Sequence, residues 1–130
     1  MNTRIVMVAS SIALFIAGAA CLFAPVETLS LFGFSGASEV SGQLLGALYL
    51  SIALANWTAR ESTIGGIYSR PLTMANFVHF VIGATVLVKG IPTDSLNVAY
   101  ICVTLVYLVF AVVFVFLLFG RLWSTGKSQR

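Results

Sequence analysis

Residues 97–120 read NVAYICVTLVYLVFAVVFVFLLFG, a continuous apolar run without a single charged side chain. An α-helix rises ~1.5 Å per residue, so ~20 apolar residues cross the ~30 Å hydrocarbon core of a bilayer. A transmembrane strand would instead be ~10 residues long and would alternate in character. The run therefore predicts a membrane-spanning helix.

Three more runs share this length and character: residues 4–24, 40–59 and 71–90. The four runs fill most of the chain, so we expect a single domain, an all-α integral membrane four-helix bundle. The first run follows Arg4 and ends in small residues, as a signal peptide does. It is longer than the ~7–15 apolar residues of a signal peptide core, and we expect a retained helix.

The composition excludes several classes of protein. Of the 130 residues, 59% are hydrophobic and 8% are charged, and the mean hydropathy is +1.02. So few charged side chains cannot cover the outside of a soluble globule. A soluble enzyme, a disordered tail and a disulfide-rich secreted module are therefore excluded.

The basic residues predict the orientation, because cytoplasmic loops carry an excess of Lys and Arg. If the amino terminus is cytoplasmic, only Lys89 of the seven basic residues lies on the outer side. The other six are then cytoplasmic: Arg4, Arg60, Arg70, Arg121, Lys127 and Arg130. We expect a multi-pass protein of the cell inner membrane with both termini in the cytoplasm. The net charge of +3 reflects this topology and does not indicate a nucleic-acid partner.

The loop after the first run has the signals of a short helix. Pro25 suits a first helical position, Glu27 complements the positive end of the helix dipole, and Gly33 can end the helix. We expect residues 25–32 to form a short interfacial helix on the outer side. Ser38 is predicted to cap the second run.

Polar side chains within the runs form the candidate site, because such groups are costly in hydrocarbon and face a partner helix or a cavity. On the second run, helical spacing predicts a shared face for Gly46, Tyr49, Ala53, Asn56 and Arg60. On the third run, it predicts a shared face for Leu72, Asn76, His79, Gly83 and Val86. Ser10 and Ser11 enter the first run near the depth of Asn56. The candidate ligand-binding residues are Tyr49, Asn56, Arg60, Arg70, Asn76 and His79.

Two interpretations of this set stay open. In the first, the polar side chains hydrogen-bond between helices, while small residues let the backbones approach. The small residues at suitable spacing are Gly42, Gly46, Ala13 and Ala17. In the second, Arg60, Glu61 and Arg70 rim a polar cavity that opens to the cytoplasm, above a floor of Asn56, Asn76 and His79. Such a cavity would hold a polar or anionic head group or a small solute.

The sequence contains no recognisable catalytic pattern. All four carboxylates lie in loops or at the ends of runs, and a single histidine cannot ligate a haem on both faces. We expect no catalytic residue, no cofactor and no metal.

Cys21 and Cys102 would lie at similar depth, so a disulfide is one alternative. We favour two buried, reduced thiols that act as small apolar residues.

Three segments carry a resemblance to a known family: Ala24-Pro25, Leu31-Phe32-Gly33, and Gly42-Gln43-Leu44-Leu45-Gly46-Ala47-Leu48-Tyr49-Leu50. This layout resembles the small bacterial DoxX-like four-helix membrane proteins. The resemblance covers the architecture of the whole chain but only one short motif in the second run. The resemblance implies that some members are membrane subunits of quinone-linked sulfur oxidation, while many have no assigned role, and it assigns no functional residue.

These features predict a non-catalytic membrane bundle that binds a lipid, a quinone or a partner subunit. The alternative is a transporter or channel for a small solute. Four helices leave little room for a pore within one chain, so transport would require a homo-oligomer. Direct redox chemistry comes third.

Overall fold

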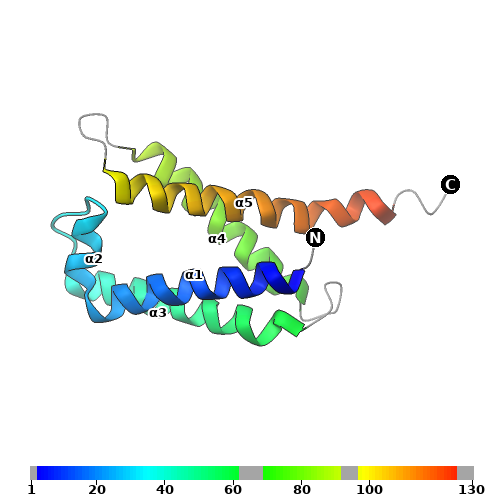
Figure 1. The fold of residues 1–130 in the computed structure, drawn as a ribbon, viewed down its shortest axis with the longest axis horizontal. Coiled ribbons are helices and arrows are strands. Elements are labelled where there is room, and N and C mark those ends of the chain that lie inside the picture. Colours follow the sequence, from blue (N-terminus) through cyan, green and yellow to red (C-terminus); the bar gives the residue numbers. More distant parts are fainter. Residues whose placement is uncertain (1–2, 62–68, 92–96, 126–130) are drawn as a thin grey trace. The chain divides into compact units, whose positions relative to one another are not determined.

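The computed structural model describes residues 3–61, 69–91 and 97–125, and the regular elements that these residues form are all helices (Figure 1). The elements in chain order are α1 (Thr3–Phe23), α2 (Pro25–Leu31), α3 (Glu39–Thr58), the 3₁₀ helix η1 (Ala59–Glu61), α4 (Ser69–Lys89) and α5 (Val98–Thr125). The four long helices begin and end within two residues of the predicted runs, except that α5 continues to Thr125. The all-α prediction is confirmed for these residues. The basic tail beyond residue 125 lies outside them.

Three helices are long and apolar enough to cross a membrane: Thr3–Phe23, Arg70–Lys89 and Val98–Phe119. These three segments indicate a membrane protein. Helix α3 has a similar length, 20 residues, but it contains Gln43, Tyr49 and Asn56 and is not among these three. The fourth membrane span therefore stays a prediction.

The chain divides into two compact units, which are described separately. The first unit contains Met1–Glu61 and Pro92–Ile101, and the second contains Ser62–Ile91 and Cys102–Arg130. Helix α5 thus contributes its first turn to the first unit and its remainder to the second. That the whole chain forms one domain stays a prediction.

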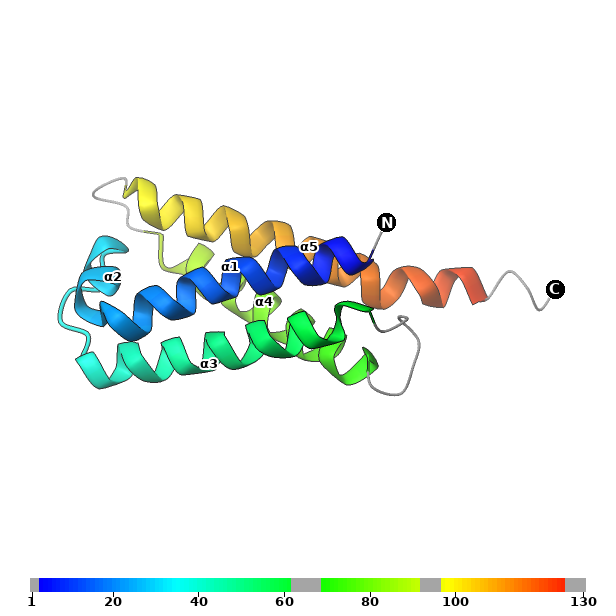
Figure 2. The ribbon, with the colours of Figure 1, turned by 60° about the horizontal axis from the view of Figure 1, so that its bottom comes forward.

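In the first unit, α1 and α3 lie side by side and antiparallel (Figures 1 and 2). Their backbones touch at Gly18 and Gly46. A Cβ atom added to Gly46 would lie 2.8 Å from both the Gly18 carbonyl oxygen and the Leu22 backbone nitrogen. The predicted contact through Gly46 is confirmed. On α1, however, the buried residue is Gly18, while Ala13 and Ala17 are only half-buried. The closest approach on α1 is therefore at Gly18, and the role of Ala13 and Ala17 stays a prediction.

The predicted short helix in the first loop is confirmed as α2. Pro25 occupies its first turn with Glu27, and Gly33 follows with a φ of 86°, a left-handed conformation that glycine adopts without strain. The predicted cap of α3 is also confirmed, because the Ser38 side chain accepts a hydrogen bond from the Ser41 backbone N–H at 3.1 Å.

Asn97 connects the end of α2 to the beginning of α5. Its Nδ2 donates to the Leu31 carbonyl oxygen at 3.0 Å, and its Oδ1 accepts from the Tyr100 backbone N–H at 3.2 Å. The Phe34 and Tyr100 rings lie 5.9 Å apart beside this connection. Asn97 thus caps α5 and satisfies a carbonyl group that the end of α2 leaves open.

The second unit has an aromatic core between antiparallel α4 and α5. The Phe80 ring stacks on Phe110 and Phe114, with centroids 4.8 and 5.5 Å away. Nearer the start of α4, Phe77 meets Phe119 edge to face at 5.8 Å. Phe80 and Phe114 are fully buried. The aromatic residues of α5 therefore divide into core positions, such as Phe114, and surface positions, such as Phe116, which is exposed.

Candidate functional site

The first polar group of the site is a buried set of hydrogen bonds between α1 and α3. Asn56 Nδ2 donates to Ser10 Oγ at 3.1 Å, and Ser11 Oγ donates to the Ala53 carbonyl oxygen at 2.7 Å. Ser10 Oγ in turn donates to the Met7 carbonyl oxygen at 3.1 Å. Ser10 and Asn56 are completely buried. The predicted common depth of the two serines and Asn56 is confirmed, and the geometry favours a packing role for Asn56.

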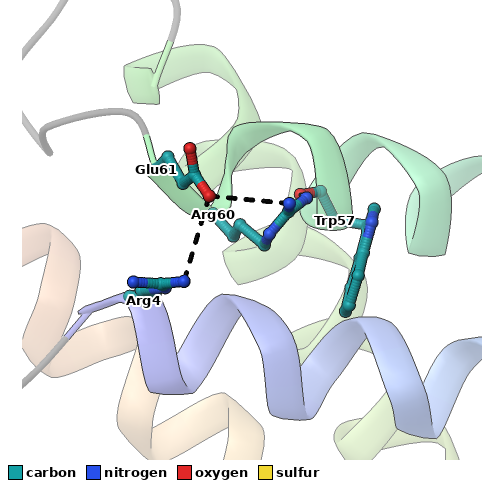
Figure 3. A network of polar contacts seen from close by, with 4 residues as sticks. All are labelled: Arg4, Trp57, Arg60 and Glu61. Carbon is teal, nitrogen blue, oxygen red and sulfur yellow. Dashed lines mark hydrogen bonds and ion pairs between the residues drawn. The ribbon is translucent and has the colours of Figure 1, made fainter.

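The second group is a charged cluster just beyond Asn56, formed by Arg4, Trp57, Arg60 and Glu61 (Figure 3). The Arg60 guanidinium carbon lies 4.4 Å from the centre of the Trp57 ring. Arg60 Nη1 also donates to the Trp57 carbonyl oxygen at 2.7 Å. These two contacts fix the Arg60 side chain over the indole.

A single carboxylate oxygen connects the two arginines of this cluster. Glu61 Oε1 lies 3.5 Å from Arg60 Nη2 and 3.9 Å from Arg4 Nη2. The side chains of Arg4 and Glu61 are 65% and 67% exposed. Ion pairs this exposed contribute ~0–1 kcal/mol. The cluster therefore combines one guanidinium that the indole holds with two exposed charges, and its formal charge is positive.

The third group lies in the second unit, between α4 and α5. The Tyr107 hydroxyl and His79 Nε2 are 3.2 Å apart, at hydrogen-bond distance, and their rings lie 5.5 Å apart. The Tyr107 ring fills the space beside Gly83, where a Cβ atom would collide with it. Tyr107 is buried and His79 is half-buried. Asn76, one turn before His79, is completely buried and donates to the Leu72 carbonyl oxygen at 2.9 Å.

The residues predicted for the site divide between the two units. The first unit holds Asn56, which is buried, and Tyr49 and Arg60, which are half-buried; the second holds Arg70, which is exposed, as well as Asn76 and His79. The cavity that would join them stays a prediction. The predicted face of α4 needs a correction, because its buried positions also include Thr73, Phe80 and Ala84, whereas Val86 is 62% exposed. Bulky Phe80 takes the core position beside His79.

Two side-chain contacts of the site were not predicted from the sequence: Trp57 with Arg60, and Tyr107 with His79. Trp57 is a residue type that is enriched at membrane interfaces, but its ring also holds the Arg60 guanidinium. Tyr107 and His79 lie on different helices, and nothing in the spacing of α4 and α5 shows that the two side chains meet. Both contacts depend on how each helix is rotated about its own axis, and the spacing of apolar residues determines that rotation only coarsely.

Both cysteines are free thiols. Cys21 is buried as expected, but Cys102 is exposed. The expectation of burial was therefore wrong for Cys102, because Tyr100, Thr104 and Tyr107 occupy the buried positions around it on α5. Within the described residues, no group of three or more His, Cys, Asp or Glu side chains could hold a metal ion.

No family model, curated protein or solved structure matches the chain, so the resemblance to the DoxX-like proteins stays a prediction.

Proposed function

We propose that the chain is a non-catalytic, multi-pass protein of the cell inner membrane that binds a lipid, a quinone or a partner subunit. In this proposal α1, α3, α4 and α5 all cross the bilayer. Both termini are cytoplasmic, α2 lies in the outer interface, and the end of α3 with η1 lies at the cytoplasmic interface. The quinone is included because of the DoxX-like resemblance.

Large exposed apolar side chains support a membrane environment. On α1, Phe15, Ile16 and Phe23 are 53%, 65% and 84% exposed. On α5, Val109 and Phe116 are 61% and 66% exposed. Isolated exposed apolar residues are ordinary in soluble proteins, but contiguous ones on helices of this length need an apolar surrounding. Acyl chains would provide it.

The hydroxyl groups of α3 support its assignment as the fourth span. Ser51 is exposed, and its Oγ donates to the Leu48 carbonyl oxygen at 2.7 Å. On α4, exposed Thr85 donates to the Val81 carbonyl oxygen in the same way, at 2.8 Å. A hydroxyl that bonds to the preceding turn of its own helix presents no unsatisfied donor to lipid. The Asn56 side chain is likewise satisfied within the unit.

The observation that carries the binding function is the order of groups along the surface at the end of α3: apolar Leu54, which is 58% exposed, then Trp57, then the charges of Arg60 and Glu61. Apolar, aromatic and charged groups follow one another here as they do from the acyl region to the head group of a lipid. The lipid and the quinone in the proposal have the same arrangement, an apolar tail followed by a polar head group.

Native mass spectrometry of the full chain from a mild detergent tests this proposal. Release of the protein with a bound phospholipid or quinone supports it. A ligand-free homo-oligomer would instead favour the alternative, a transporter or channel for a small solute, in which several copies together enclose the path.

A further inference from the structure

We infer that the phosphate of an anionic phospholipid binds between the guanidinium groups of Arg4 and Arg60, in place of the Glu61 carboxylate. This inference rests on the proposed function and names its ligand. The acyl chains of that lipid would then extend along the apolar surface beside Trp57, which is 45% exposed.

The two arginines of the cluster share one oxygen atom of a single carboxylate. Both guanidinium groups approach the same atom, Glu61 Oε1, at 3.5 and 3.9 Å. Charge-assisted hydrogen bonds between guanidinium and oxygen are shorter, at ~2.7–2.9 Å. Glu61 therefore bridges the arginines through one oxygen, whereas the two non-bridging oxygens of a phosphodiester could each face one arginine.

The charges favour an anionic ligand, because Arg4 and Arg60 outnumber the single carboxylate. Arg60 is the preorganised half of the site, since Trp57 beside it holds the guanidinium through the ring and the backbone carbonyl (Figure 3). The Arg4 and Glu61 side chains are more than half exposed, so both are accessible to a ligand. Trp57 also points to the source of the phosphate, because an indole ring partitions into the head-group region of a bilayer.

Lipid quenching of Trp57 tests the inference in the full chain. The protein has two tryptophans, so the Trp123→Phe variant reports on Trp57 alone. This variant is reconstituted with phosphatidylglycerol or phosphatidylcholine that carry the same brominated acyl chains, and the ratio of the two association constants is measured. We expect phosphatidylglycerol to be favoured about fivefold, the contribution of roughly one basic residue near a membrane surface.

Substitutions within the cluster should move that ratio in opposite directions. Arg60→Gln and Arg4→Gln should each bring it close to one, whereas Glu61→Gln should raise it, because the competing carboxylate is removed. Lys89→Gln, which removes an exposed charge at the end of α4, is the matched control and should leave the ratio unchanged. Taking the ratio within each variant cancels changes in the fluorescence of Trp57 itself.

The possible failures are distinguishable. Equal quenching by the two brominated lipids in the parent would overturn the inference while still placing Trp57 in a bilayer. Quenching by neither lipid would overturn the proposed function as well. Relief of phosphatidylglycerol quenching by inorganic phosphate, compared with chloride at equal ionic strength, would assign the site to a soluble phosphate and overturn the lipid assignment.

Discussion

Replacing Gly46 by valine should separate α1 from α3. A Cβ atom at this position would lie 2.8 Å from two backbone atoms of α1, whereas ordinary contacts begin at 3.4 Å. Backbone atoms cannot turn away as a side chain can, so the helices must move apart by about 0.6 Å. A gap of this size forfeits a quarter to a half of the dispersion energy of neighbouring contacts. It also stretches the hydrogen bond from Ser11 to Ala53.

Overpacking of a close contact costs ~1–3 kcal/mol, and we expect Gly46→Val to lie in the upper part of that range. The free energy of unfolding would be measured by titrating the purified protein from a mild detergent into SDS. Ala47→Val is the matched control, because Ala47 is exposed on the same helix and should change stability by less than ~0.5 kcal/mol. Equal stabilities of the two variants would refute the backbone contact at Gly46.

Three further predictions use the same preparation. Asn56→Leu should lower the free energy of unfolding by only ~0.6 kcal/mol, the mean for hydrogen bonds between membrane helices, and a loss several times larger would contradict a simple packing role. Gly83→Val should lower the free energy of unfolding more than Tyr107→Phe, because the valine displaces the Tyr107 ring whereas the phenylalanine removes only its hydroxyl. The reverse order in the SDS titration would exclude the packing of the Tyr107 ring against Gly83. In folded protein without reductant, a thiol-alkylating reagent should modify Cys102 faster than Cys21, as measured by intact mass, because only Cys102 is exposed. A modification that requires reductant would instead indicate a disulfide.

The element boundaries could be predicted because the signals are local. Continuous apolar runs determine the long helices, Pro25 begins α2, and the Ser38 hydroxyl caps α3. Each signal acts within a few residues of its own position. The buried face of α3 was also predictable, since Gly46, Ala53 and Asn56 recur at helical spacing.

The partners of these faces could not be predicted in the same way. Small residues occupy several faces of α1, and only packing selects Gly18 over Ala17. In a helix that is apolar all round, periodicity gives a weak indication of rotation, and this explains the error at Val86. The contact between His79 and Tyr107 requires the relative rotation and register of α4 and α5, neither of which a single sequence specifies.

The most direct test of the account is the side of the membrane on which each terminus lies, measured with reporter fusions to the two ends of the full chain. Four spans require both termini on the same side, and the basic residues predict that this side is the cytoplasm. If α3 does not cross the bilayer, the three helices that are long and apolar enough to do so place the termini on opposite sides. Two cytoplasmic reporters would agree with the account, and reporters on opposite sides would contradict it.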